Sequence, residues 1–305
     1  MDLLYFFEGL RNPVCDVFFS LITHLGEETV FIVVGILFYW CINKWDGYYL
    51  FAVGLMGTVI NQFLKLWFRI PRPWVRDPEF TIVESARAEA TGYSFPSGHT
   101  QSAIGTFGGI ARLNKRPWVR VLCIAACVLI PLSRMWLGVH TPADVGVSIA
   151  VGLVLVFGLY PLLRKAQKSK ITMRLVMGVL IALAAAFLVF VYVYPFPADT
   201  DPTNYEHGLT NAYKMLGCLA ALWLSYEVDE AYTHFDTQAV WWAQILKLVV
   251  GLIPLLLIKS VLKTPMHQLI GDVYIADGLR YFLLTAFAGC VWPLTFKFWS
   301  KLGKK

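Results

Sequence analysis

The chain has 305 residues, of which 57% are hydrophobic and only 15% are charged, and its formal net charge is +6. This composition excludes an ordinary soluble domain, in which about 25% of the residues are charged. Lys and Arg gather in short loops between apolar stretches of nearly bilayer length, as membrane orientation requires. We therefore expect an all-α, polytopic membrane protein and no binding of nucleic acid.

Apolar stretches predict a membrane bundle of about nine transmembrane helices, with a catalytic core in the first five. Residues 1–28 precede these helices, and their apolar part is too short to cross, so we expect an interfacial or re-entrant segment. A basic stretch at 164–174 divides the remainder into a membrane core, 29–164, and a four-helix extension, 165–305. The predicted spans are 30–43, 48–67, 99–111, 119–137, 143–163, 174–194, 209–226, 240–262 and 275–299.

Basic residues predict the orientation of these helices. They are concentrated after the third span, after the fifth span and at the C-terminal end, which share one side of a nine-span protein. The positive-inside rule makes that side cytoplasmic. The loop at 68–98 and the turn at 138–142 then face outward. A bound anion is the obvious reason for this cluster of cations, which contains Arg69, Arg72, Arg76 and Arg87. For Arg69 and Arg76, however, snorkelling of the side chain to the lipid headgroups is a sufficient explanation.

Polar chemistry is concentrated in three segments at the outward ends of predicted helices. The first, "KLWFRIPRP", contains Lys65 and Arg72. The second, "PSGH", opens the third helix, where Ser97 as cap and Gly98 as a point of close approach make an anion cradle beside His99. Taken alone, ordinary helix capping explains Ser97 and Gly98 better than a binding site does.

The third segment is "SRMWLGVHTPAD". Thr141 and Pro142 have the pattern of a helix start, and this pattern also explains Asp144. It does not explain His140 just before the cap, nor Arg134 one or two turns earlier. A carboxylate within reach of an imidazole holds one ring nitrogen protonated and leaves the other nitrogen free to attack.

Together the three segments supply three cations, an N–H cradle and two histidines. A phosphoryl group in transfer spreads negative charge over its equatorial oxygens and needs such a cationic clamp, while its leaving oxygen needs a proton. One histidine can attack phosphorus while the other donates that proton. This combination predicts phosphoryl transfer.

The segments, in this order and at these spacings, resemble the three-part signature of the type 2 phosphatidic acid phosphatase superfamily, and every signature position is filled. The resemblance implies that His140 is the nucleophile that forms a phosphohistidine, that Asp144 orients it and that His99 protonates the leaving group. It also implies that no metal or other cofactor is required. It covers residues 30–163, about half of the chain, and implies that phosphate is held by Lys65, Arg72, Ser97, Gly98 and Arg134.

We therefore expect a phosphatase that acts on a lipid phosphate or diphosphate at the outer face of a bacterial cytoplasmic membrane. Its partners would be a membrane lipid and the bilayer, and the oligomeric state is left open. Candidate substrates are phosphatidic acid, phosphatidylglycerol phosphate, polyprenyl diphosphates such as undecaprenyl diphosphate, and sphingoid phosphates.

Two alternatives remain open. The nine-span layout is similar to that of the glucose-6-phosphatase branch, which favours a soluble sugar phosphate as substrate. A non-catalytic phospholipid-binding or transport protein is the second alternative. A transporter places polar groups near the middle of the bilayer, whereas here they lie at the outward ends. A scaffold without activity would be expected to lack His99 or His140, and both are present.

Overall fold

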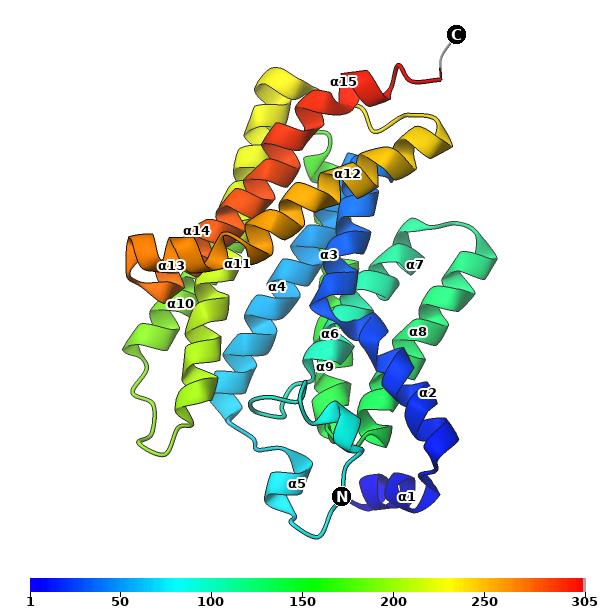
Figure 1. The fold of residues 1–305 in the computed structure, drawn as a ribbon, viewed down its shortest axis with the longest axis vertical. Coiled ribbons are helices and arrows are strands. Elements are labelled where there is room, and N and C mark those ends of the chain that lie inside the picture. Colours follow the sequence, from blue (N-terminus) through cyan, green and yellow to red (C-terminus); the bar gives the residue numbers. More distant parts are fainter. Residues whose placement is uncertain (304–305) are drawn as a thin grey trace. The chain divides into compact units, whose positions relative to one another are not determined.

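The computed structural model describes residues 1–303, and within this range the chain forms helices and turns without a β-strand. It divides into two compact units. Unit 1 comprises Met1–Ile32, Met56–Tyr160 and Tyr194–Gly208, whereas unit 2 comprises Val33–Leu55, Pro161–Val193 and the chain from Leu209 onward. The all-α fold predicted from the sequence is confirmed (Figure 1).

Unit 1 contains the residues of all three polar segments. Its short helical turns are η1 (His24–Gly26), η3 (Glu84–Ala86) and the π-helical η4 (Ile104–Gly108). Its complete helices are α1 (Asp2–Leu10), α2 (Pro13–Thr23), α5 (Pro73–Arg76), α6 (Gly98–Ala103), α7 (Gly109–Leu113) and α8 (Pro117–Trp136). Four helices contribute to both units, namely α3 (Glu28–Leu37), α4 (Lys44–Phe68), α9 (Pro142–Ala166) and α11 (Pro202–Val228).

Unit 2 contains most of the C-terminal half of the chain. Its complete helices are α10 (Lys170–Val193), α12 (Trp241–Ser260), α13 (Lys263–Ile270), α14 (Val273–Ala286) and α15 (Phe296–Trp299). Shorter turns are η2 (Phe38–Ile42), η5 (Asp229–Thr233), η6 (Phe287–Val291) and η7 (Trp292–Thr295).

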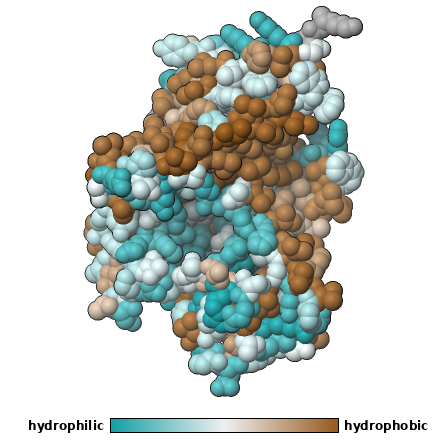
Figure 2. Space-filling view, in the orientation of Figure 1, coloured by the Kyte–Doolittle hydropathy of each residue, from teal (hydrophilic) through white to brown (hydrophobic). Residues whose placement is uncertain are grey.

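The apolar surface of unit 2 suits contact with lipid. Figure 2 shows a broad band of apolar side chains over α12. Large exposed apolar patches are unusual on soluble proteins, and a helix facing hydrocarbon requires them. The exposed side chains of α12 are Trp241, Trp242, Ile245, Leu246, Val249, Val250, Ile253, Leu256 and Leu257.

Six helical stretches in the described residues are long and apolar enough to cross a membrane. The bent pair Pro13–Gly26 and Glu28–Ile42, whose axes differ by 50°, makes a seventh if it counts as one broken span. The predicted count of nine is therefore not confirmed. The six stretches are Lys44–Arg76, Pro117–Trp136, Pro142–Ala166, Lys170–Val193, Trp241–Ser260 and Val273–Trp299.

Two predicted spans differ from these six for separate reasons. The stretch at 99–111 lies in α6, η4 and α7, which have 6, 5 and 5 residues. A helix of that combined length is about 24 Å long, which is shorter than the hydrocarbon core. The stretch at 209–226 lies in α11, which is long enough at 27 residues but interrupts its apolar face with polar residues such as Asn211 and Lys214.

The short helix α6 is the centre of unit 1. Its side chains Thr100, Gln101 and Ala103 are buried, and the helix packs against α8. The hydroxyl of Ser148 on α9 donates a hydrogen bond to the carbonyl of Ser97, over 2.9 Å, and thereby ties the start of α6 to α9. The N-termini of α6 and α9, which carry two of the three polar segments, therefore meet.

Candidate active site

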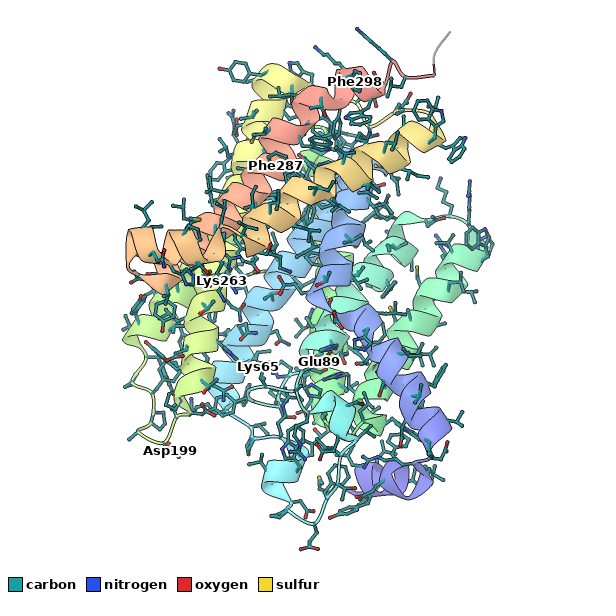
Figure 3. The ribbon with its side chains drawn as sticks, in the orientation of Figure 1. Lys65, Glu89, Asp199, Lys263, Phe287 and Phe298 are labelled. Carbon is teal, nitrogen blue, oxygen red and sulfur yellow. The ribbon has the colours of Figure 1, made fainter. Side chains whose placement is uncertain are left out.

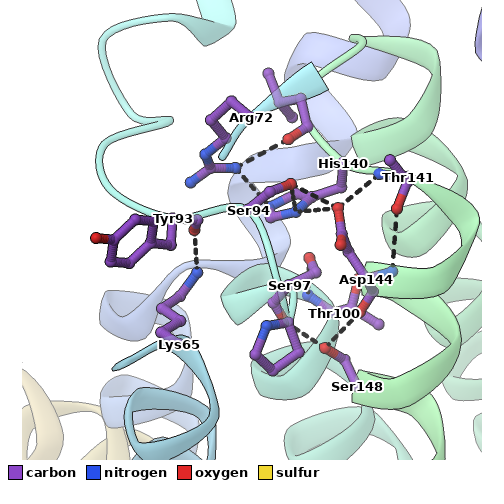
Figure 4. Close-up of polar contacts among 12 residues, drawn as sticks. Lys65, Arg72, Tyr93, Ser94, Ser97, Thr100, His140, Thr141, Asp144 and Ser148 are labelled. Atoms are coloured by element: carbon purple, nitrogen blue, oxygen red, sulfur yellow. Dashed lines mark hydrogen bonds and ion pairs between the residues drawn. The ribbon is translucent and has the colours of Figure 1, made fainter. Parts of the chain in front are cut away.

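The third polar segment begins α9 with a reciprocal cap. The Thr141 backbone N–H donates to Asp144 Oδ2 over 2.7 Å, and the Asp144 N–H donates to Thr141 Oγ1 over 3.3 Å (Figure 4). The same Oδ2 atom accepts a 2.5 Å hydrogen bond from Ser94 Oγ and lies 3.5 Å from His140 Nδ1. One carboxylate oxygen therefore both caps the helix and faces the imidazole.

His140 presents its two ring nitrogens to different partners. Nε2 lies 2.9 Å from Nη1 of Arg72, and Nδ1 lies 3.5 Å from Ser94 Oγ and from Asp144. A guanidinium has donors only, so Nε2 must accept, and the ring hydrogen is placed on Nδ1. Nε2 therefore carries the lone electron pair of the ring, which accepts the hydrogen bond from Arg72.

The imidazole of His140 is buried, with 2% of its side chain exposed. Burial lowers its pKa well below the usual 6.5, and the cations Arg72, Arg134 and Lys65 lower this pKa further. The ring is therefore neutral at physiological pH, which is the state that a nitrogen nucleophile needs.

A tight turn between α8 and α9 sets the position of His140. Gly138 has φ of +80°, a region that favours glycine, and a Cβ there would lie 2.7 Å from Arg11 Nη2. The N–H groups of Val139 and His140 both donate to the carbonyl of Arg134, over 3.1 and 3.3 Å. The turn therefore links His140 directly to the last part of α8.

Arg72 is fixed by backbone acceptors as well as by His140. Nε donates to Gly92 O over 3.0 Å, Nη2 donates to Thr91 O over 2.8 Å, and Nη1 donates to Val139 O over 2.9 Å. The side chain is 6% exposed. A guanidinium held in this way can meet phosphate oxygens at little further entropic cost.

The other arginines of the loop at 68–98 have separate partners or face solvent. Arg69 donates to Leu66 O over 2.8 Å, Arg87 forms a 2.7 Å ion pair with Glu84, and Arg76 is exposed. Among these four arginines, Arg72 is the one that contacts His140.

The two other cations of the predicted site also lie in unit 1. The Nζ atom of Lys65 donates to the carbonyl of Tyr93 over 2.5 Å. Arg134 is 1% exposed, and its Nη1 donates to Thr23 Oγ1 over 2.7 Å. The buried Nε of Arg134 has no hydrogen-bond partner among the described residues. A buried donor without a partner costs free energy, and an oxygen of a bound anion would satisfy it.

The N-terminus of α6 forms the cradle expected from "PSGH". Ser97 is the N-cap and accepts a hydrogen bond from the Thr100 N–H over 3.4 Å, while its own N–H donates to Asp144 O over 3.2 Å. A Cβ added at Gly98 would have Asn61 Oδ1 as its nearest neighbour, at 4.0 Å. Backbone N–H groups at this helix start can therefore be approached closely by an anion.

His99 follows directly in α6. Its Nε2 atom is buried, has no hydrogen bond within residues 1–303 and lies 3.8 Å from Glu89 Oε2. Burial lowers the pKa of His99 to about 2, and the nearby cations, Arg134 first, act in the same direction. This histidine is therefore neutral when no anion is bound.

All eight predicted site residues lie in unit 1, where hydrogen bonds join the loop, α6 and the start of α9. Sequence reasoning missed Ser94, Thr23 and Glu89. Ser94 lies two residues before Pro96, but no spacing rule assigns it to Asp144. Thr23 lies 111 residues before its partner Arg134, so no local pattern could have found it.

Family comparisons identify the class of protein to which this site belongs. A family model described as the PAP2 superfamily matches residues 45–168, which contain all eight site residues. A second family model, described as the PAP2 superfamily phosphatase, transmembrane extension, matches residues 213–305. The chain is therefore a membrane phosphatase. It belongs to the PAP2 superfamily, which confirms the resemblance found in the sequence.

Individual relatives are similar to this chain over different shares of its length. Phosphatidylglycerophosphatase B of Bacillus subtilis is 29% identical over 161 residues, which cover 48% of this chain and 75% of the relative. "Probable sphingosine-1-phosphate phosphatase" of Dictyostelium discoideum is 28% identical over 71% of this chain and 55% of the relative. Undecaprenyl-diphosphatase BcrC of Bacillus subtilis is 35% identical over 34% of this chain and 51% of the relative. The chain thus spans about half the length of the last two relatives. No solved structure is significantly similar to the chain.

Proposed function

We propose that this chain hydrolyses the phosphate or diphosphate group of a membrane lipid through a phosphohistidine at His140. The observation that carries the proposal is that the two ring nitrogens of His140 have different partners. Nε2 accepts from Arg72 while Nδ1 faces Ser94 and Asp144. A neutral ring held in this tautomer has its nucleophilic electron pair directed toward the cation that would hold the phosphate.

In the first step, the Nε2 electron pair of His140 attacks phosphorus and the bond from phosphorus to the lipid oxygen breaks. His99 gives its proton to that leaving oxygen. In the second step, water attacks the phosphohistidine, the P–N bond breaks, and His99 takes a proton from the water. The negative charge of a bound phosphate group favours the protonated form of His99 and so opposes the effect of burial.

The cations stabilise charge in both steps. Arg72, Lys65 and Arg134 would face the equatorial oxygens of the phosphoryl group, and the N–H groups at Gly98 would face one of them. Substituting one such donor in an enzyme typically costs about 10²–10³ in rate. Three fixed cations thus supply a large part of the stabilisation of the transition state.

A lipid substrate is supported by the relatives and by the membrane-spanning helices. The names of the relatives refer to phosphatidylglycerophosphate, sphingosine 1-phosphate and undecaprenyl diphosphate, all of which carry phosphate on an apolar anchor. A lipid tail can stay in hydrocarbon while its headgroup reaches the site at the end of α4 and α8.

The outer face of a cytoplasmic membrane is supported by helix α8. It has 20 residues and therefore spans about 30 Å. Arg134 lies near its C-terminal end, and a basic loop lies at its N-terminal end. The positive-inside rule assigns the basic end to the cytoplasm and so the site to the opposite face. The residues of this basic group are Arg112, Lys115, Arg116 and Arg120.

Phosphate release by the detergent-purified chain tests the proposal. The substrates are phosphatidic acid, phosphatidylglycerol phosphate, undecaprenyl diphosphate, sphingosine 1-phosphate and glucose 6-phosphate, each in EDTA. We expect release from at least one lipid at a higher rate than from glucose 6-phosphate. His140→Ala abolishes this release, whereas His207→Ala, at an exposed histidine of the same unit, does not. A folded wild-type chain that releases no phosphate, or an active His140→Ala, would overturn the proposal.

A further inference from the structure

Three ligand-type side chains meet beside the active site of unit 1. His24 lies in η1, Glu27 follows η1 directly, and Glu89 lies in the loop before α6. His24 Nδ1 is 2.5 Å from Glu27 Oε1 and 3.6 Å from Glu89 Oε1. The three ligand atoms lie within 4.8 Å of one another, and Figure 3 labels Glu89 next to α6.

The donor set of this cluster suits a divalent cation of the zinc type. Zn²⁺ accepts imidazole nitrogen at 2.0–2.1 Å and carboxylate oxygen at 2.0–2.2 Å, in tetrahedral geometry. Those bond lengths place two ligand atoms about 3.3–3.5 Å apart. The separation of His24 and Glu89 is already close to this value, and that of His24 and Glu27 reaches it if their contact opens by about 1 Å.

The charge of the cluster also favours a cation. Two carboxylates face one imidazole, and Arg87, two residues before Glu89, is already paired with Glu84 at 2.7 Å. The side chains of Glu27 and Glu89 are 35% and 37% exposed, so an ion can enter from solvent. The carboxylates of Glu27 and Glu89 would balance the charge of a cation bound here without any change in the fold.

The fourth ligand position points to His99. Its Nε2 lies 3.8 Å from Glu89 Oε2, is buried, and makes no hydrogen bond in the described part of the chain. Turn η1 packs directly on this residue, because a Cβ at Gly26 would lie 3.0 Å from His99 O and 3.2 Å from His99 Cβ. Glu89 therefore joins the cluster to His99, with Oε1 facing His24 and Oε2 facing Nε2 of His99.

We propose that His24, Glu27 and Glu89 form a binding site for Zn²⁺, and that the bound ion takes Nε2 of His99 as its fourth ligand and inhibits the enzyme. A metal-bound Nε2 has no electron pair left to carry the proton that the leaving oxygen needs. The inhibitory half of this inference rests on the proposed function, because it uses the role of His99 as acid. The metal site itself does not.

Calorimetric titration of the EDTA-stripped, detergent-purified full chain with ZnCl₂ tests the site without any activity. We expect one Zn²⁺ per chain and an affinity at least about tenfold weaker for each of His24→Gln, Glu27→Gln and Glu89→Gln. Glu84→Gln is the matched control, since it lies in the same loop but outside the cluster, and it binds as the wild type does. The site is refuted if the wild type binds no Zn²⁺, or if His24→Gln and Glu27→Gln bind it unchanged while their melting temperatures match the wild type.

Phosphate release in the presence of ZnCl₂ tests the link to His99. The wild type is inhibited, and Glu27→Gln, with unchanged activity in EDTA, needs at least about tenfold more Zn²⁺ for the same inhibition. An active wild type that binds Zn²⁺ without inhibition overturns the link to His99. A chain that binds Zn²⁺ but hydrolyses none of the phosphates contradicts the proposed function and leaves the metal site supported.

Discussion

Ser94 Oγ donates a 2.5 Å hydrogen bond to Asp144 Oδ2, and the hydroxyl and the carboxylate both lie beside Nδ1 of the His140 imidazole. His140 Nδ1 is 3.5 Å from both groups. In the proposed mechanism, the group that orients the nucleophile is therefore a pair of side chains. We therefore expect Ser94 to be a positioning residue that acts through His140 and Asp144.

Ser94→Ala is expected to lower kcat by about 10- to 100-fold, because a hydrogen bond to a charged group contributes about 1.5–3 kcal/mol. KM changes little, since Ser94 has no predicted contact with phosphate. Steady-state phosphate release measures both constants. Ser85→Ala, an exposed serine of the same loop, is the control and keeps wild-type kcat. Equal kcat for Ser94→Ala and the wild type contradicts the positioning role.

Asp144→Asn is expected to lower kcat by at least about 10²-fold while the fold is kept. An amide oxygen still accepts the cap hydrogen bond from Thr141, but it has no negative charge to stabilise the imidazolium that forms during transfer. Melting temperature by circular dichroism checks the fold and phosphate release checks activity. A large fall in melting temperature with normal kcat per folded molecule would assign Asp144 to helix capping alone.

Arg72→Lys is expected to raise KM and lower kcat, with a combined loss of about 10²–10³-fold in kcat/KM. The planar guanidinium of Arg72 contacts three backbone carbonyls and His140 at the same time. Lysine keeps the charge but has no such planar group. The control is Arg76→Lys, at an exposed arginine of the same loop. If Arg72→Lys and Arg76→Lys have the same kcat/KM, the geometry at Arg72 is unimportant.

The low pKa of His140 predicts a specific loss of stability in acid. Below pH 6.5 the unfolded chain protonates this histidine, while the folded chain keeps it neutral because burial lowers its pKa. The unfolded state then binds more protons, so stability falls as the pH decreases below 6.5. The loss is about 1.4 kcal/mol per pH unit.

Thermal unfolding at pH 7.5 and pH 5.5 measures this effect. The wild type should lose more stability between the two pH values than His140→Asn, which has no imidazole to protonate. His207→Asn removes an exposed histidine instead and should behave as the wild type does. An identical pH response in the wild type and His140→Asn means that the imidazole is not held neutral.

From the sequence, the residues of the candidate site could be predicted better than the contacts that they make with distant parts of the chain. His99, His140 and Asp144 could be proposed as site residues because each lies at or directly beside a helix start, within short segments that resemble the family signature. The contact of Arg134 with Thr23 could not, since it depends on the packing of α8 against α2. The cluster of His24 and Glu89 was missed for the same reason.

The fold shows a similar division. Long apolar stretches such as those of α8, α9 and α10 were predicted because length and hydropathy alone decide them. The π-helical turn η4 at Ile104–Gly108 and the bend of 50° between α2 and α3 were not, since both depend on tertiary packing. The stretch at 99–111 was predicted to be a membrane span because an apolar sequence is needed equally for burial in protein and in lipid.

The most direct test of the phosphohistidine mechanism is to trap the covalent intermediate. The wild-type chain is mixed with a lipid carrying radiolabelled phosphate, quenched in alkali within one turnover and digested, and the label is mapped by mass spectrometry. We expect an acid-labile, alkali-stable label on the peptide that contains His140, and no label in His140→Ala. Turnover of the lipid by the wild type with no label on His140 at any time would contradict the mechanism.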